Sequence, residues 1–144
     1  YRETDATKFI EDSDIARVEG NGFMFVIRLK DHLIGGIGLD HVNKSVFELG
    51  YWISYRHWGK GFATESVSAI IDLAFEQLVL SQIIASCHEV NYRSVNVLLK
   101  NRFSRTGTRL KFSRFHDKEV RVIDFIRNRI TGTGRVSSAQ QIPK

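Results

Sequence analysis

Two different spacings of apolar residues divide the chain, and the first is typical of β-strands. Between residues 23 and 54, short apolar runs alternate with polar turn residues. The pattern predicts a hairpin of two strands over residues 23–29 and 33–39, then a third strand over residues 46–54 that is rich in aromatic and β-branched side chains. Gly50, in the middle of this third strand, indicates a bulge or a place where another backbone approaches closely.

From residue 61 the spacing becomes helical. Over residues 61–80 the apolar side chains recur every three or four positions, which places them along one face of an amphipathic helix of about five turns. The members of this face are Ala63, Val67, Ile70, Ile71, Ala74, Phe75 and Leu78. The regularity of this pattern makes the long helix the clearest element of the chain.

A further strand and helix follow the long helix. Residues 82–87 form a short apolar run that we interpret as a buried strand. Asn91 is suited to cap the start of a second helix over residues 92–101. Three apolar residues of this helix are expected to face the core: Val95, Leu98 and Leu99.

The two ends of the chain differ from its middle. Residues 110–115 and 120–127, joined by a polar turn, predict a second hairpin. Residues 131–144 contain Gly, Ser and the only Pro, and are expected to be a flexible basic tail. The first 20 residues are polar and acidic, with apolar positions that allow one or two short helices and with Ser13 or Asp14 as a cap.

The order of these elements defines the fold class. A hairpin, strand, helix, strand, helix and hairpin in succession indicate an α+β domain with a mixed, mostly antiparallel sheet flanked by helices. The crossover through the long helix should be right-handed, so that the third and fourth strands run parallel. The chain has 144 residues, about a third of them Val, Ile, Leu or Phe, which suits one domain over residues 1–130.

Charge is distributed unevenly along the chain. The formal net charge is +5. Residues 1–50 hold 6 basic and 9 acidic residues, whereas residues 100–144 hold 12 basic and 3 acidic ones. Such a basic C-terminal third attracts polyanions such as nucleic acid, the ribosome, an acidic peptide or a phosphorylated cofactor, or else it is simply a solvated basic face and tail.

The cysteine, the histidines and the hydropathy exclude several classes of protein. The single cysteine, Cys87, excludes an internal disulfide and a cysteine-rich zinc module, and it suits a reducing compartment. The five histidines lack the spacing of metal ligands, so we expect no metal. The longest apolar run covers only residues 23–27, which is too short to span a bilayer. We therefore expect no membrane partner and a cytoplasmic location.

The turn between the third strand and the long helix holds the clearest candidate site. Gly59 and Gly61 stand just before the helix, where backbone N–H groups have no partner inside the helix and carry a partial positive charge. Because glycine has no Cβ, an anion can reach these amides, and Arg56 and Lys60 add cationic donors. The pattern predicts a phosphate or pyrophosphate site, unless the glycines merely shape the turn.

Two common phosphate motifs fit this turn poorly. A Walker loop requires Lys and then Ser or Thr after the second glycine, and the Gly59-Lys60-Gly61 segment does not meet that spacing. A Rossmann fingerprint needs a third glycine where Thr64 stands and an acidic ribose ligand, which Glu89 could mimic. The antiparallel strands upstream also count against a Rossmann sheet.

A third pattern covers more of the chain. The segment RHWGKG (residues 56–61) resembles the Arg/Gln-x-x-Gly-x-Gly/Ala acetyl-CoA signature of the GNAT N-acetyltransferase superfamily. The flanking segments ELGYWI (48–53) and ATE (63–65) are similar to its RimJ/RimL-like branch, and so are NYRS (91–94) and LLKNRF (98–103). The resemblance covers roughly residues 23–130, and the two groups of segments at matching spacing make it specific.

The resemblance implies a GNAT-like fold, with a splayed parallel strand pair at the cofactor site, and acetyl-CoA as cosubstrate. Backbone groups of residues 52–54 would pair with the pantetheine arm, and amides of residues 57–62 would hold the pyrophosphate. Asn91 would hydrogen-bond the pantetheine, and Ser94 would lie near the sulfur. The cofactor-binding positions implied in this way are Trp52, Ile53, Ser54, Arg56, His57, Trp58, Gly59, Lys60, Gly61, Phe62, Ala63, Thr64 and Asn91.

The resemblance also implies that the amine attacks the thioester directly, so that Cys87 is not needed as a nucleophile and is expected to be a buried structural thiol. Glu48 is then the candidate general base, directly or through a water, unless it is an ordinary surface carboxylate. A backbone N–H beside the expected bulge would polarise the carbonyl. Ser94 is the candidate acid for the departing thiolate, unless it only completes the helix cap, and Tyr92 is the alternative acid.

The sequence departs from the family's pattern in three ways. Leu98 stands where many members have a tyrosine acid, which is why Ser94 is considered for this role. Arg102 replaces the glycine of the Lys-x-Gly-Phe segment and alters the expected turn after the second helix. The family's first strand and part of its early helices are absent or shortened, so we expect the N-terminal part of the domain to be truncated.

The residues and the resemblance together predict an enzyme that transfers an acetyl group from acetyl-CoA to a primary amine. The acceptors implied are protein N-terminal amines, such as those of ribosomal proteins, and small-molecule amines. Ribosome association and a homodimer are compatible with this prediction, and nucleic acid is not the expected partner. The alternative is a non-catalytic module that binds CoA or nucleic acid through the same basic loop and tail, and binding to nucleic acid would weaken steeply with salt.

Overall fold

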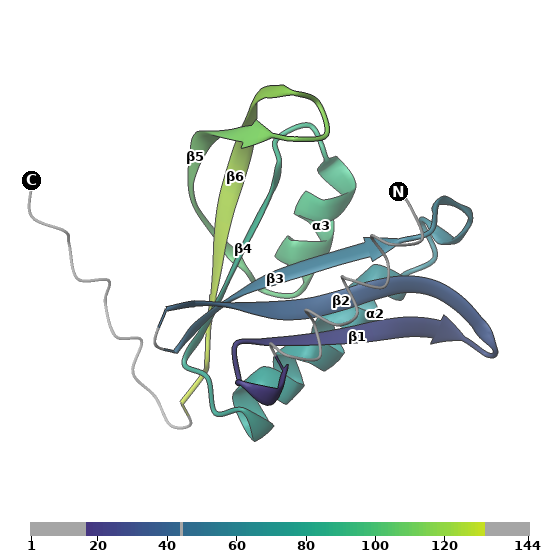
Figure 1. Cartoon of the computed structure of the whole chain (residues 1–144), viewed down its shortest axis with the longest axis vertical. Coiled ribbons are helices and arrows are strands. Elements are labelled where there is room, and N and C mark those ends of the chain that lie inside the picture. The colour runs from purple at the N-terminus through teal and green to yellow at the C-terminus, as the bar shows by residue number, and fades with distance from the viewer. Residues whose placement is uncertain (1–16, 44, 132–144) are drawn as a thin grey trace, which may run out of the picture.

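A single six-stranded sheet organises the part of the chain that the structure describes, residues 17–43 and 45–131 of a computed structural model (Figure 1). Its strands are arranged in the order β1-β2-β3-β4-β6-β5, and β3 and β4 are parallel whereas the other neighbours are antiparallel. This mixed sheet confirms the predicted fold class. The strands are β1 (Gly22–Leu29), β2 (His32–Asn43), β3 (Val46–Ile53), β4 (Gln82–His88), β5 (Ser104–Ser113) and β6 (Lys118–Asn128).

The helices follow the third and fourth strands, as predicted. A short 3₁₀ turn, η1 (Tyr55–His57), leads into α2 (Phe62–Asp72), and α3 (Tyr92–Lys100) follows β4. The long helix is shorter than the predicted residues 61–80, because a π-helical turn, η2 (Leu73–Gln77), ends it. The chain then passes through Val79 in a left-handed conformation, and Leu80 returns to the core.

The two halves of the sheet separate between β3 and β4. These strands pair only from Val46 opposite Gln82 to Leu49 opposite Ala85, although both continue further. Figure 1 shows them diverging beyond this point, with β4 running upward and β3 to the right. The backbone of β3 beyond Leu49 therefore has a ladder partner on the β2 side only.

Gly50 marks this separation and not a bulge. The β2–β3 ladder is regular across Gly50, which lies opposite Gly38, and its irregularity falls between His41 and Asn43. The predicted bulge at Gly50 is therefore wrong. The glycine is the first residue of β3 after its last pair with β4, and the space where its Cβ would stand is open.

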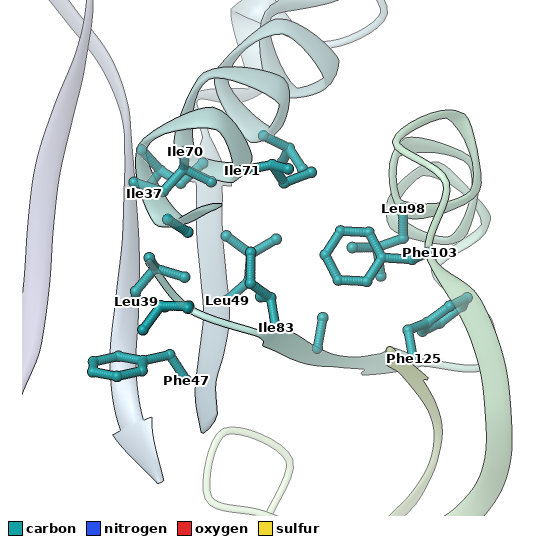
Figure 2. Packing of buried hydrophobic residues seen from close by; sticks show 14 of the residues in the cluster. Ile37, Leu39, Phe47, Leu49, Ile70, Ile71, Ile83, Leu98, Phe103 and Phe125 are labelled. Carbon is teal, nitrogen blue, oxygen red and sulfur yellow. The ribbon is translucent and has the colours of Figure 1, made fainter. Parts of the chain in front are cut away.

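The core lies between α2, α3 and one face of the sheet (Figure 2). Its strand residues include Leu39, Leu49 and Ile83, and the predicted apolar face contributes Val67, Ile70 and Ile71 from α2 and Ala74 and Phe75 from η2. Of the residues predicted to face the core from α3, Val95 and Leu98 are buried, whereas Leu99 is 42% exposed. Phe103, just after the helix, fills the core instead.

The last hairpin begins earlier than predicted. Strand β5 starts at Ser104, whereas the sequence predicted a strand only from residue 110. Almost every residue of β5 is exposed, so its first half shows no alternation of apolar and polar residues that could reveal a strand. The expected N-terminal helix caps and the expected tail lie almost wholly outside the described residues. Within those residues, no helix combines the length and the apolar character that a membrane span requires.

Arg102 forms the turn after α3, at the position where the resembled pattern has glycine. It has φ +61°, the left-handed region, and directly follows the cap residue Asn101. The N–H of Phe103 donates to the Leu98 carbonyl at 3.0 Å, and that of Arg102 donates to the Leu99 carbonyl at 3.0 Å. This bond pair is the Schellman motif, and it is retained despite a residue that carries a Cβ.

We expect Arg102→Gly to stabilise the protein by about 0.5–1 kcal/mol, because a left-handed residue with a Cβ is strained and glycine is not. Denaturant unfolding measures the gain. Arg102→Ala is the matched control, since alanine keeps the strain but removes the positive charge, which together with burial lowers the pKa of Arg127. An equal gain from alanine would contradict strain as the cause.

Candidate functional site

The start of α2 presents backbone amides without partners inside the helix. The first helical bond joins the Glu65 N–H to the Gly61 carbonyl at 3.0 Å, so the N–H groups of Phe62, Ala63 and Thr64 precede it. The cap residue Gly61 has φ +84° and offers no side-chain acceptor to these amides. The helix therefore begins with three donors and a partial positive charge directed outward, an arrangement that binds anions.

A cavity of about 450 Å³ opens at this point, between the start of α2, the end of β3 and the exposed side of α3. It lies where β3 and β4 separate. The residues that line it are Tyr51, Trp52, Ile53, His57, Trp58, Gly59, Gly61, Phe62, Ala63, Thr64, Asn91, Arg93, Ser94, Asn96, Val97 and Lys100. A second cavity of about 310 Å³, between β1, β2 and α2, is almost wholly apolar and lacks titratable groups.

Most of the sequence-predicted residues meet in the larger cavity, and four do not. Ser54, Arg56 and Lys60 are absent from its lining, as is the candidate base Glu48. Arg56 and Lys60 are exposed, and the Ser54 N–H donates to the Ile34 carbonyl at 2.7 Å. The cationic donors that sequence reasoning placed on the turn therefore lie outside the cavity in this structure.

The cations of the cavity come from α3 instead. Arg93 and Lys100 both line it, together with Asn96 and Val97. The guanidinium of Arg93 lies over the ring of Trp58, 5.2 Å from its centroid. Sequence reasoning missed these residues, although a signal was present: Arg93, Val97 and Lys100 recur at helical spacing on the face beside the buried Val95 and Leu98.

Trp58 fixes the turn against β3. Its indole Nε1–H donates to the Ile53 carbonyl at 2.7 Å, and its ring contacts the Tyr55 ring edge-on at 5.0 Å between centroids. His57 lines the cavity nearby, and its Nδ1 atom is buried and has no hydrogen-bond partner among the described residues. The turn thus holds an imidazole nitrogen in reach of the cavity with its hydrogen-bonding capacity unused.

Asn91 and Ser94 combine a structural contact with a place in the cavity. The Asn91 side chain accepts a hydrogen bond from the Ser94 N–H at 3.2 Å, which confirms the predicted cap of α3. This bond uses the Ser94 backbone, whereas its hydroxyl group lies near that of Tyr51. Both residues line the cavity, whereas the alternative acid Tyr92 is 72% exposed and does not.

Asn101 ties the two helices of the site together. It is the buried polar residue of the described core, and its Nδ2 group donates to the Thr64 carbonyl at 3.2 Å and to the Val97 carbonyl at 3.0 Å. The first turn of α2 is therefore held against the end of α3. This contact sets the spacing between two groups: the unpartnered N–H groups of residues 62–64 (the bare amides) and the face of α3 that carries Arg93 and Lys100.

Burial shifts the pKa of two groups beside the separation of β3 and β4. Burial raises the pKa of Tyr51 above 10.0, and the nearby Ser94 hydroxyl opposes the shift without cancelling it. Burial also raises the pKa of the Cys87 thiol, with Arg105 opposing. Both groups therefore hold their protons at neutral pH, and the raised pKa of Cys87 fits the predicted structural thiol.

A charged network joins β4, β5 and β6 beyond this separation. Arg109 Nε donates to Asp124 Oδ2 at 2.8 Å, and the Ser86 hydroxyl donates to Asp124 Oδ1 at 2.7 Å. Partial burial alone would raise the pKa of Asp124, but these two hydrogen bonds and the charges of Arg109 and Lys111 outweigh it and hold the pKa below its ordinary value. The side chain of Asp124 is therefore ionised at neutral pH.

We expect Asp124→Asn to lower the free energy of unfolding by up to about 1 kcal/mol at pH 7, since both partners are partly exposed. A lowered pKa stabilises the fold above the unfolded-state value near 3.9, and this contribution disappears as the pH falls through the folded-state pKa. Denaturant unfolding at pH 7 and near pH 3 checks the difference, with the exposed Glu119→Gln as control. An equal loss at both pH values would contradict the role of the ionised carboxylate.

Comparison with known proteins shows which family shares this sequence and fold. The family described as an acetyltransferase (GNAT) domain matches residues 1–104. A ribosomal-protein-serine acetyltransferase of Escherichia coli is 30% identical over 108 residues, which are 73% of this chain and 60% of that protein. More generally, the chain spans between 51% and 60% of the length of the first curated relatives it matches.

Solved structures share the fold at lower sequence identity. Mycobacterium smegmatis RimJ in complex with CoA-disulfide superposes with a TM-score of 0.81 at 20% identity, over 87% of this chain and 61% of that one. A spermidine N-acetyltransferase of Vibrio cholerae has a TM-score of 0.74 at 21% identity, over 85% of this chain and 74% of that one. Because the family match covers more than half of the sequence and the fold agrees, the chain belongs to the GNAT acetyltransferase family.

Proposed function

We propose that this chain is an N-acetyltransferase that moves an acetyl group from acetyl-CoA directly to a primary amine. The observation that carries the proposal is the cavity at the separation of β3 and β4, with the bare amides of α2 at one end and the unpaired edge of β3 along its side. Phosphates suit the first feature, and an extended arm with amide groups suits the second.

The cavity residues divide into two groups that match the two ends of a CoA molecule. The amides of residues 62–64 would hold the pyrophosphate, with Arg93 and Lys100 supplying positive charge and His57 a ring nitrogen. The Ser54 N–H and the Ile53 carbonyl are already engaged. Backbone groups of β3 near residues 52–54 that these bonds leave free would pair with the pantetheine, because β3 lacks a neighbour there on the β4 side. Asn91 and Ser94, which line the cavity at the start of α3, would lie beside the pantetheine and the thioester.

Glu48 is positioned for a different task from that of the cavity residues. It alternates with Phe47 and Leu49, which are buried under the helices, so its side chain belongs to the opposite face of the sheet. An amine that approaches from that face would meet the thioester through the gap between β3 and β4. Glu48 would then take the amine proton, directly or through a water, without touching the cofactor.

An α-amine is the acceptor best suited to a single carboxylate base. At pH 7 an α-amine with a pKa near 8 costs about 1.4 kcal/mol to deprotonate, whereas a lysine with a pKa near 10.4 costs about 4.6 kcal/mol. The relatives include a ribosomal-protein-serine acetyltransferase and a spermidine N-acetyltransferase. We therefore propose a protein N-terminal amine, such as that of a ribosomal protein, as the acceptor, with a small-molecule amine as the second candidate.

The test combines CoA binding with a thiol-release assay. Titration calorimetry measures CoA binding, and acetyl-CoA is then supplied with peptides that have free or blocked N-termini and with spermidine. Turnover on the free N-terminus but not on its blocked counterpart supports the proposal, and turnover on spermidine alone selects the second acceptor class. Stoichiometric CoA binding without any turnover would instead support a non-catalytic binding module.

A further inference from the structure

The hydroxyl of Tyr51 is buried and forms no hydrogen bond of good geometry among the described residues, although Tyr51 lines the larger cavity. The Ser94 hydroxyl is its polar neighbour there. The ring itself packs against the hydrophobic core. A phenylalanine would fill the same space without burying a polar group, so packing does not explain the hydroxyl.

The position of Tyr51 in β3 places this hydroxyl at the separation of the two strands. The β3–β4 ladder ends with Leu49 opposite Ala85, and Tyr51 is the next β3 residue on the same face of the sheet. Continuing the register would bring Tyr51 opposite Cys87, and these two side chains do interact electrostatically. Tyr51 therefore stands beside the gap between the strands, on the side covered by the helices.

Ser94 of α3 approaches the same point from above the sheet. Its hydroxyl lies close enough to the Tyr51 hydroxyl to oppose the rise in the Tyr51 pKa. Both residues line the cavity, Tyr51 from β3 and Ser94 from the first turn of α3. Two hydroxyl groups from different elements thus converge at the place where the proposed function puts the thioester sulfur.

We propose that Tyr51 is a catalytic residue whose hydroxyl donates a hydrogen bond to the sulfur of the thioester as the carbon–sulfur bond breaks. This inference rests on the proposed function, and it adds a residue to which neither the sequence pattern nor the relatives gave a role. The thioester sulfur would then supply the hydrogen-bond acceptor that the Tyr51 hydroxyl lacks.

The step balances without a further reactant. The amine nitrogen forms a bond to the carbonyl carbon, the carbon–sulfur bond breaks, and its electron pair stays on sulfur. The amine proton leaves toward Glu48 or a water. The Tyr51 proton remains on its oxygen and is shared with the thiolate, which later takes a proton from solvent.

The protonation of Tyr51 suits donation of a hydrogen bond rather than loss of a proton. Burial raises its pKa above 10.0, so the hydroxyl is intact across the neutral range. An ordinary thiol has a pKa near 8.5 and holds its proton less tightly than tyrosine does. A hydrogen bond from Tyr51 therefore stabilises the thiolate and lowers the pKa of the leaving thiol.

The test compares the wild-type chain with Tyr51→Phe, which removes only the hydroxyl, and with Thr108→Val, which removes an exposed hydroxyl of β5 outside the cavity. CoA is the probe. Calorimetry measures its affinity, and the ultraviolet absorbance of its thiolate, with the desulfo-CoA complex as blank, measures the pKa of the bound thiol. Steady-state turnover and a denaturant midpoint complete the comparison.

We expect Tyr51→Phe to lower kcat about 10- to 100-fold, with the KM for acetyl-CoA changed by less than about 2-fold. We also expect the pKa of the bound CoA thiol to rise by about one unit and the denaturant midpoint to stay level or rise, because an unsatisfied buried group is removed. Thr108→Val should match the wild type in each measurement.

Three results would overturn the inference. An unchanged pKa of the bound thiol in Tyr51→Phe means that the hydroxyl does not contact sulfur. A lower midpoint accompanied by a proportional loss of CoA binding means that the role is structural. Absence of CoA binding by the wild-type chain contradicts the proposed function first, and this inference with it, so the two failures are distinguishable.

Discussion

Gly61→Val should weaken CoA binding by at least about 100-fold. Valine is strained at φ +84°, at a cost of about 1–2 kcal/mol, and relief of this strain would turn the amides of residues 62–64 away from their common direction. Each hydrogen bond to a charged group contributes about 1.5–3 kcal/mol, so misaligning even one or two of them gives a loss of this size. Titration calorimetry with CoA measures the effect.

Two further variants separate the backbone effect from other causes. Gly107→Val makes the same change in β5, where the glycine has no left-handed φ and its Cβ would meet nothing, and CoA binding should be unaffected. Gly61→Asn should bind CoA with intermediate affinity, because asparagine tolerates the left-handed region better than valine does. Undiminished binding by Gly61→Val would remove the bare amides from the proposed site.

Glu48→Gln should lower kcat/KM for a peptide α-amine by about 100-fold or more near pH 7, while the affinity for CoA stays the same. The variant keeps the size of the side chain but cannot take a proton. Because an α-amine has a pKa near 8, a larger share of the acceptor is neutral at pH 9, and the gap between variant and wild type should narrow there. A pH–rate profile with saturating acetyl-CoA measures both effects.

The control for Glu48 is its cross-strand neighbour. Asp40 of β2 lies directly opposite Glu48 and is exposed, so Asp40→Asn changes the local charge by the same amount and leaves the Glu48 carboxylate in place. We expect it to change kcat/KM by less than about 3-fold. Full activity of Glu48→Gln across the pH range would exclude Glu48 as the base.

Much of the fold could be predicted because apolar residues recur along the sequence with the periods of helices and strands. The face of α2 from Val67 to Phe75 recurs at helical spacing, and the first three strands are punctuated by turn residues. The first half of β5 escaped prediction because its side chains are almost all exposed, so no alternation selects a strand. Gly50 alone predicts either a bulge or a close approach of another backbone, because a glycine in a strand does not show which neighbouring strand has been lost.

The candidate site was also predictable from the sequence only in part. Glycines before a helix predicted the bare amides, since the conformation of the backbone at Gly59 and Gly61 is a local property. The cationic side chains that line the cavity, Arg93 and Lys100, were not predicted, because they reach it only through the packing of α3 against α2. Their helical spacing places them on one face of α3, but it does not show that this face borders the site.

The sequence by itself determined the elements, the family resemblance and the anion-binding start of α2, because each depends on residues that are neighbours along the chain. Tertiary structure alone decided where β3 and β4 part, which cations face the cavity, and that the hydroxyl of Tyr51 is buried beside Ser94 without a hydrogen bond. These features depend on the meeting of segments some 40 residues apart, and such contacts follow from the packing of the whole core rather than from any local pattern.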